Sequence, residues 1–226
     1  MCGRYSFAPK PKQLQESLAD LLLPDQLEIS FNIAPTQQAY VVTSELPARL
    51  KKMEWGLVPS WSKDGKNSGK MINARSETID EKPAFHDAFL SRRCLVPADS
   101  FYEWRKEPDG RKTPFRIFLR SEELMFMAGI WERWKQGNIE KYTFSILTTT
   151  PNQEMSELHN RMPVILADKF SRSKWLKNEP MKTLLPLLNP VQDHSLVMYA
   201  VSDKLNKVSE NKAELQIPVE PPLRLF

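Results

Sequence analysis

Residues 125–149, MFMAGIWERWKQGNIEKYTFSILTT, predict a β-hairpin. The apolar runs 125–131 and 142–149 have the composition of strands, and the polar stretch between them contains Gly137-Asn138, a dipeptide typical of tight turns. Four further segments are also rich in β-branched, aromatic and other apolar residues and predict strands: 39–43, 50–57, 114–119 and 195–201. Strands therefore dominate the predicted secondary structure.

Short helices are expected between the strands. Residues 11–23 predict a helix because four leucines fall on one face at helical spacing: Leu14, Leu18, Leu21 and Leu22. Shorter helices are expected near 83–91, 168–177 and 181–188. The order lacks the strand–helix–strand rhythm of a parallel sheet, so we expect an α+β fold on a mixed, largely antiparallel sheet that curls toward a barrel.

One domain is expected over residues 1–226, a length that can bury a substantial core. Residues 62–70 form a polar loop, and the proline-rich tail from about residue 207 is expected to wrap the surface. The net charge of +4, from 32 Lys and Arg against 28 Asp and Glu, permits a polyanionic partner without requiring one. No apolar run is long enough for a membrane span.

Two cysteines, Cys2 and Cys94, are too few for a disulfide framework, and the chain start lacks the apolar core of a secretory signal. Both features predict the cytoplasm, where thiols stay reduced.

If Met1 is removed, Cys2 carries an α-amine and a thiol on adjacent carbons. Such a 1,2-aminothiol condenses with an aldehyde to an imine and then closes to a thiazolidine. The alternative interpretation is that Cys2 has no catalytic role and lies in a flexible tail.

Glu103 and His159 are the candidate proton-transfer groups. Glu103 lies among the aromatic residues of Phe101-Tyr102-Glu103-Trp104, surroundings that raise a carboxyl pKa and suit acid–base work. A simple ion pair with Arg105 or with a neighbour across a strand is the competing interpretation. His159 follows a threonine-rich strand end, although a lone histidine is more often structural. No His and Cys spacing matches a zinc site, so neither metal nor cofactor is expected.

Aromatic residues beside arginines predict contacts with unpaired bases and phosphates. Most of the six tryptophans are expected in the core, and Trp61, beside the polar loop, is the one expected to be exposed.

Taken together, these segments resemble the SOS-response-associated peptidase (SRAP) family. The pieces occur in the family order: MCGR at the start, N-x-AP at 32–35, WGL-x-P-x-W at 55–61, INAR-x-E at 72–77, RC-x-x-P-x-x-x-FYEW at 93–104, AG-x-W at 128–131, and a threonine-rich strand leading to H-x-R-MP at 159–163. The resemblance covers residue 2 to about residue 210. Members of the SRAP family crosslink covalently to abasic sites in single-stranded DNA.

The resemblance implies roles for particular residues. Cys2, after self-removal of Met1, would form the thiazolidine with the ring-opened sugar, Asn73 would position it, and Glu103 would transfer protons. His159 would assist imine formation and strand cleavage by β-elimination. The implied DNA-binding residues are Arg4, Arg75, Arg161, Thr148, Trp61 and Pro35. The implied protein is a monomer in the cytoplasm, associated with the nucleoid when bound to DNA.

Two other functions remain open at this point. A cysteine peptidase acting on other proteins would use Cys2 as nucleophile and His159 as base. A non-catalytic module for single-stranded nucleic acid would use only the basic and aromatic residues. An abasic-site crosslink that depends on Cys2 would separate the three.

Overall fold

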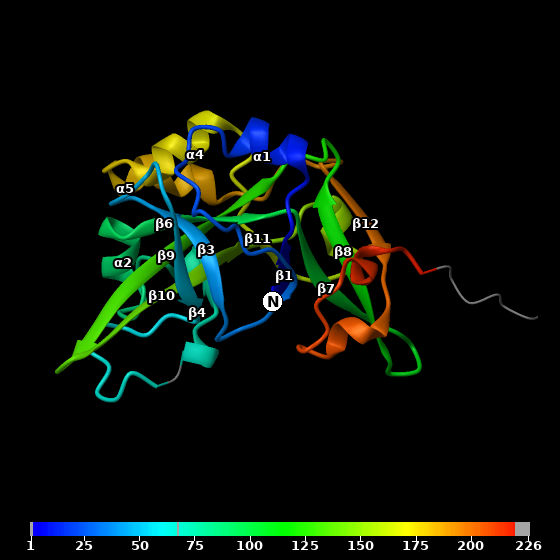
Figure 1. The fold of residues 1–226 in the computed structure, drawn as a ribbon, viewed down its shortest axis with the longest axis horizontal. Helices are drawn as coiled ribbons and strands as arrows, with labels where there is room; N and C mark the ends of the chain where they lie inside the picture. The colour runs from blue at the N-terminus through cyan, green and yellow to red at the C-terminus, as the bar shows by residue number, and fades with distance from the viewer. Residues whose placement is uncertain (1, 67, 220–226) are drawn as a thin grey trace, which may run out of the picture.

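The computed structural model describes residues 2–66 and 68–219, and the expectations for Met1 and for the last residues of the tail lie outside them. Its centre is a closed barrel, in which each strand pairs with the next and β10 returns to β9 (Figure 1). The barrel strands are β3 (Gln38–Thr43), β4 (Leu50–Trp55), β6 (Arg93–Ala98), β9 (Met125–Gln136) and β10 (Ile139–Thr149). Two short strands add to β10: β5 (Asn73–Arg75) and β11 (Met162–Pro163).

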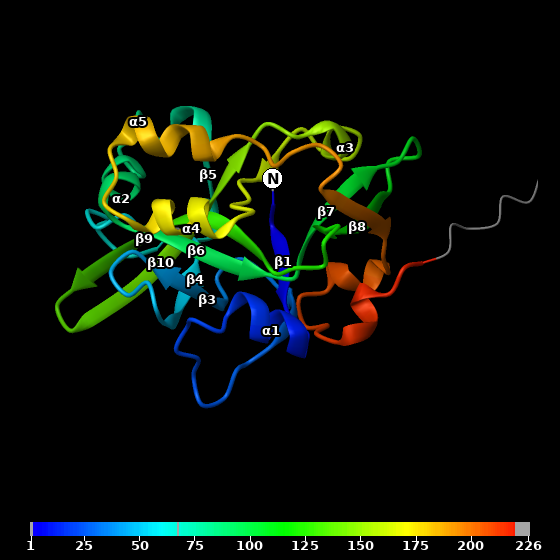
Figure 2. The ribbon, with the colours of Figure 1, turned by 90° about the horizontal axis from the view of Figure 1, so that it is seen from above.

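A second sheet stands beside the barrel and is antiparallel throughout. Its strands, in spatial order, are β12 (Leu196–Ala200), β8 (Lys112–Leu119), β7 (Ser100–Lys106), β1 (Arg4–Phe7) and β2 (Ser30–Ile33). Figures 1 and 2 both place β1 between the barrel and strands β7 and β8. Because only β10 runs parallel to its neighbours β4 and β5, the expectation of a mixed, largely antiparallel sheet closing into a barrel is confirmed.

The predicted hairpin forms the longest ladder of the barrel. It pairs Gln136 with Ile139 at the turn and Gly129 with Ile146 at the far end, and Gly137 takes the left-handed φ of 56°. Glycine is required at position 129, because a Cβ there would lie 2.8 Å from the sulfur of Cys94 on β6. Cys94 is thereby part of the packing between two barrel strands.

The barrel and the second sheet share one hydrophobic core, and an aromatic contact joins them. Tyr5 on β1 packs edge-on against Trp55 at the end of β4, with ring centroids 5.1 Å apart. The Trp55 indole N–H also donates to the carbonyl of Ile72, 2.9 Å away, one residue before β5. Trp55 therefore fixes the start of β1 and the start of β5 against each other.

Short helices flank the strands: α1 (Pro11–Ser17), α2 (His86–Ser91), α3 (Gln153–Ser156), α4 (Lys169–Leu176) and α5 (Met181–Leu184), with 3₁₀ turns at Ser68–Lys70, Ser76–Thr78, Leu185–Leu188, Asp203–Asn206 and Ala213–Gln216. Arg93 on β6 ties two of them together. Its buried guanidinium donates to carbonyls at the C-terminal ends of α2 and α4, where a cation complements the helix dipole.

The predicted helix over 11–23 is wrong beyond residue 17. Leu18 is buried as expected, but Leu22 is exposed, and its backbone pairs with the chain around Arg49. The Leu22 N–H donates to the carbonyl of Ala48, and the Leu22 carbonyl accepts from Leu50. These long-range bonds satisfy the backbone groups that a longer helix would have satisfied internally.

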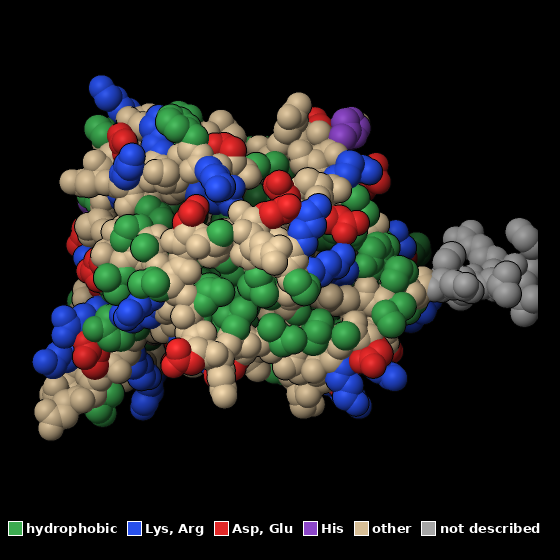
Figure 3. Space-filling model, turned by 45° about the horizontal axis from the view of Figure 1, so that its top comes forward, with side chains coloured by type: hydrophobic (Ala, Val, Ile, Leu, Met, Phe, Trp, Pro, Cys, Tyr) green, Lys and Arg blue, Asp and Glu red, His purple; other side chains and the backbone are tan. Residues whose placement is uncertain are grey.

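The outer surface carries charges of both signs. Figure 3 shows basic and acidic side chains interspersed around an apolar area, with no broad field of one sign on that face. Among the described residues, no helix is long and apolar enough to cross a membrane.

Candidate active site

Cys2 lies where the chain enters β1, and the barrel holds its backbone. The Asn73 side-chain amide, at the start of β5, donates to the Cys2 carbonyl across 2.8 Å. The Cys2 side chain is fully buried, and its thiol lies 3.8 Å from the carbonyl of Arg4, to which it can donate. The sequence-predicted pair Cys2 and Asn73, 71 residues apart, is therefore in direct contact.

Glu103 comes to the same point from β7. Antiparallel pairing of Arg4 with Tyr102 brings residue 103 beside the chain start. Burial raises the pKa of Glu103 to about 7, as expected for a carboxyl removed from water. Burial, and then the charge of Glu103, raise the pKa of the Cys2 thiol far above its usual range. Arg105, one partner expected in the alternative interpretation, pairs with Glu107.

His159 faces Glu103 from the segment that follows α3. Its backbone N–H donates to the carbonyl of Met155, and its ring Nδ1 accepts from the N–H of Arg161 across 3.0 Å. In the neutral ring, the proton is then on Nε2, which lies 4.0 Å from Oε2 of Glu103. Burial lowers the pKa of His159, which favours this neutral form. Protonation of Nδ1 would redirect that nitrogen to the Arg161 carbonyl, 3.2 Å away.

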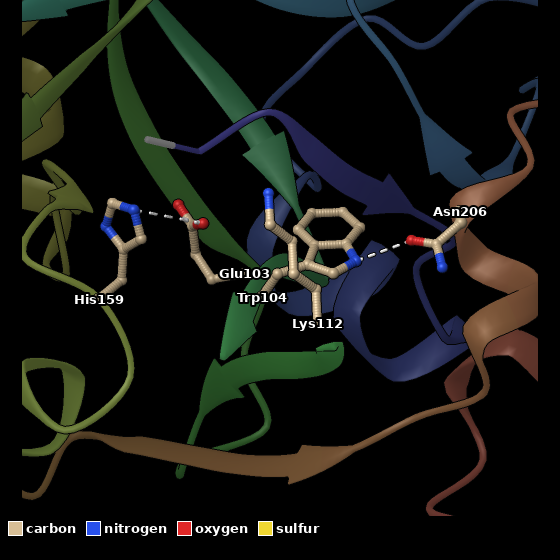
Figure 4. Close-up of a pocket in the computed structure, with 5 residues that line it drawn as sticks. All are labelled: Glu103, Trp104, Lys112, His159 and Asn206. Atoms are coloured by element: carbon tan, nitrogen blue, oxygen red, sulfur yellow. Dashed lines mark hydrogen bonds and ion pairs between the residues drawn. The ribbon is translucent and has the colours of Figure 1, made fainter. Parts of the chain in front are cut away.

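A cavity of about 570 Å³ opens next to this pair. Figure 4 shows Glu103 and His159 pointing toward each other, and Trp104, Lys112 and Asn206 along the rest of the wall. The Trp104 indole N–H donates to the side-chain oxygen of Asn206 across 2.8 Å, which anchors the ring at the cavity wall. The described residues contain no cluster of His, Cys, Asp and Glu that could hold a metal ion.

Arg161, Thr148 and Arg75 meet at the edge of the barrel. Both terminal nitrogens of Arg161 donate to the carboxylate of Glu77, and the Arg161 side chain also donates to the carbonyl and hydroxyl of Thr148. The hydrogen bonds from Arg161 to the Glu77 carboxylate lower the pKa of Glu77. Thr148 is fully buried, and its hydroxyl donates to the carbonyl of Ala74. Arg75 is exposed and lies beside Thr148 in the β5–β10 register.

The remaining predicted DNA-binding residues occupy different environments. Arg4 is half-buried, donates to Asn32 and to the carbonyl of Leu205, and stands over the Trp104 ring at 5.9 Å. Trp61 is 64% exposed, which confirms the expectation for this tryptophan. Pro35 is half-buried and precedes a turn in which Thr36 takes a φ of 71°. Among these three, only the Trp61 ring is largely open to solvent.

The model of the family described as SOS response associated peptidase (SRAP) matches residues 1–208. The chain belongs to this family. It is 41% identical over 222 residues to the "abasic site processing protein YoqW" of Bacillus subtilis, covering 95% of this chain and 98% of that protein. The "abasic site processing protein HMCES" of Gallus gallus is 31% identical, covering 97% of this chain and 78% of that protein.

A solved structure supports the same relationship. The crystal structure of a Bacteroides thetaiotaomicron protein superposes with a TM-score of 0.86 at 27% identity, covering 97% of this chain and all of that one. The architecture described above is therefore that of an experimentally determined protein.

The sequence analysis did not single out Glu77, Lys112 or Asn206 of this SRAP chain. Glu77 stands inside the INAR-x-E motif, two residues after Arg75, but its partner Arg161 is 84 residues away. Trp104 belongs to the FYEW motif, but its role as a cavity wall depends on Asn206, 102 residues later. No local pattern in the sequence connects those two positions.

Proposed function

We propose that this protein processes abasic sites in DNA by trapping the sugar aldehyde on Cys2. The observation that carries the proposal is the convergence of Asn73 and Glu103 on Cys2, the second residue of the chain. The names of its relatives, abasic site processing proteins, agree with this chemistry. An abasic site equilibrates with a free aldehyde, which is the electrophile that a 1,2-aminothiol captures best.

The first step is removal of Met1. Water adds across the Met1–Cys2 peptide bond, methionine leaves, and the α-amine of Cys2 becomes available. We propose that the protein performs this hydrolysis itself, with Glu103 moving the proton. A carboxyl group with a pKa of about 7 can both accept and return a proton near neutral pH.

Capture then proceeds through two bonds to one carbon. The Cys2 amine adds to the C1′ aldehyde, and loss of water gives an imine. The thiol adds to the imine carbon, its proton passes to the nitrogen, and a thiazolidine ring closes. Because burial keeps the thiol protonated, ring closure requires a base, and Glu103 is the nearby carboxylate that acts as one.

His159 supplies the second proton-transfer group. In the protonated ring Nδ1 donates to the Arg161 carbonyl and Nε2 carries a proton that faces Glu103, so Nε2 can protonate the hydroxyl that leaves as water during imine formation, and the ring becomes neutral. The same group can serve β-elimination from the imine. There the C2′ proton is removed, the C3′–O bond breaks and the 3′ phosphate departs, which cuts the strand.

Single-stranded DNA is the proposed substrate, because the aldehyde has to enter a cavity and reach the buried Cys2. Arg75 and Arg161 would hold phosphates, with Thr148 orienting Arg161. Arg4 and Pro35 would contact the strand near the chain start, and Trp61 offers an exposed face on which a base can stack. The proposal includes one domain over residues 1–226, acting as a monomer in the cytoplasm and at the nucleoid.

The test is a denaturing gel of mature protein incubated with a single-stranded oligonucleotide that contains one abasic site. We expect a covalent adduct that is absent with Cys2→Ala, and an intact mass that lacks one methionine. Hydrolysis of an added peptide without an adduct would instead indicate a peptidase of other proteins. Binding without either reaction would indicate a non-catalytic module.

A further inference from the structure

The C-terminal segment lies across the second sheet and reaches the cavity. Residues 202–219, here called the C-terminal strap, contain the 3₁₀ turns Asp203–Asn206 and Ala213–Gln216 and appear orange to red in Figure 1. Leu205 and Leu215 of the strap pack with Tyr102 of β7 in an apolar cluster separate from the main core. The strap is therefore a packed element of the described structure.

Asn32 of β2 attaches the strap to the sheet. This side chain is 1% exposed, and its amide nitrogen faces three strap carbonyls, those of Leu205, Lys207 and Glu210, at 3.4, 3.1 and 2.7 Å. Its oxygen accepts from the guanidinium of Arg4 across 2.7 Å. Both ends of one buried amide are thus satisfied, one by the strap and the other by β1.

Two strap residues continue from Asn32 to the cavity wall. The Leu205 carbonyl accepts a second bond from Arg4, at 2.8 Å, and Asn206 accepts the bond from the Trp104 indole. Arg4 in turn stands over the Trp104 ring. Release of the strap would free the edge of Trp104 and remove one of the two bonds that aim Arg4 toward it.

We infer that Asn32 is a positioning residue for DNA binding, which acts by locking the C-terminal strap so that Trp104, with Arg4 over its ring, forms a fixed wall of the cavity. The inference rests on the proposed function for its ligand, single-stranded DNA beside the lesion. It gives the N-x-AP motif a second role besides Pro35, and it makes residues of the strap part of the DNA site. Asn32 is not in contact with Glu103, His159 or Asn73 through any hydrogen bond described above.

Asn32→Asp is the variant that tests the inference most directly. It keeps an oxygen for Arg4, but it replaces the amide donor with a carboxylate that faces three carbonyls, which is unfavourable in a buried site. Asn211→Ala is the second variant, because exposed Asn211 accepts from the Phe31 N–H and the Ser30 hydroxyl and so holds the strap without touching Arg4. Asn189→Ala, an exposed asparagine outside the strap, is the matched control.

Three measurements are compared: deuterium exchange of strap peptides, the Kd for a fluorescent single strand carrying a tetrahydrofuran abasic analogue, and the crosslinking rate at saturating abasic DNA. For Asn32→Asp we expect faster exchange over 203–216, a Kd raised about tenfold, and a saturating rate within about twofold of wild type. Asn211→Ala should give the same pattern with a rise of about threefold. The control should match wild type.

The inference is overturned if deuterium exchange of the strap is unchanged in both variants. It is also overturned if the strap exchanges faster but the Kd for the abasic analogue is unchanged. A lower saturating rate with an unchanged Kd also overturns it, because the strap would then serve folding or chemistry rather than binding. If Asn32→Asp does not fold, Asn211→Ala decides by the same criteria. Wild-type protein that binds the analogue but captures no abasic DNA refutes the capture chemistry alone, whereas wild-type protein that does not bind refutes both.

Discussion

Two regions of this protein, which we call the reactive corner and the arginine edge, differ in how their charged groups are exposed to solvent. The reactive corner consists of Cys2, Asn73, Glu103 and His159, and burial shifts the pKa values of its thiol, carboxyl and imidazole. The arginine edge consists of Arg75, Glu77, Thr148 and Arg161, where an ion pair reaches the surface, since the Glu77 side chain is 43% exposed. The crosslinking rate, which depends on the reactive corner, should vary with pH. The affinity for DNA at the arginine edge should vary with salt concentration, because salt screens exposed charges more strongly than buried ones.

The largest expected effect is loss of the crosslink in Cys2→Ser. Serine leaves the terminal amine in place but replaces the sulfur that closes the stable ring, so imine formation and strand cleavage should survive without a persistent adduct. Denaturing gels of the same reaction, with and without borohydride trapping of the imine, measure both outcomes.

Cys94→Ala is the matched control, because Cys94 is equally buried but packs against Gly129 in the barrel. It should crosslink at the wild-type rate. A stable adduct with Cys2→Ser, or its loss with a folded Cys94→Ala, would contradict the assignment of the reactive corner.

The next effect concerns the pH dependence of the corner. Glu103→Gln should slow crosslinking by about 10²-fold, because the thiol loses its base. In the wild type, the Glu103 carboxyl with its pKa of about 7 is protonated below that pH and cannot accept the thiol proton. The rate should therefore fall as the pH drops through about 7, and the fall should be absent in the variant. An identical pH profile in both proteins would remove Glu103 from this role.

The arginine edge should show a smaller effect that depends on salt. Arg161→Gln should weaken binding of single-stranded DNA about tenfold at low salt and reduce the slope of log Kd against log salt by about 0.7, the value for one phosphate on a single strand. Fluorescence anisotropy at several salt concentrations measures both quantities. An unchanged slope would mean that Arg161 serves only the fold.

Glu77→Gln tests the other half of that ion pair. The Glu77 carboxylate occupies the two terminal nitrogens of Arg161 with which a phosphate would pair. Its neutral analogue should bind DNA about threefold more tightly at low salt and equally at high salt. Weaker binding would instead show that Glu77 orients Arg161 for the phosphate.

The smallest expected effect on stability is that of Trp61→Ala. Because this ring is 64% exposed, the free energy of unfolding should change by less than about 0.5 kcal/mol. Loss of one stacked base should weaken single-strand binding about fivefold. Chemical denaturation and anisotropy on the same preparation separate the two effects, and a large loss of stability would place Trp61 in the packing of its loop.

Local patterns predicted the strands that are rich in β-branched, aromatic and other apolar residues. The segments 39–43, 50–57, 114–119, 125–131, 142–149 and 195–201 each coincide with a strand, although 50–57 extends past the end of β4 and 195–201 extends past both ends of β12. The pattern did not predict β6, because Pro97 stands inside it and the strand is buried along its whole length, without alternation. It also missed β1 and β7, whose sequences were noted for their motifs and whose pairing is the contact that brings Glu103 to Cys2.

The sequence alone determined which chemical groups are available: an aminothiol once Met1 is removed, a carboxyl group among aromatic residues, and one histidine before an arginine. Residue identity is sufficient for these because each group's reactivity is intrinsic to its side chain. The tertiary structure alone decided that these groups meet, how far burial shifts their pKa values, and that Asn32, Glu77 and Asn206 hold their neighbours in place. Those properties depend on distance and dielectric surroundings, which pairing between strands far apart in the chain creates.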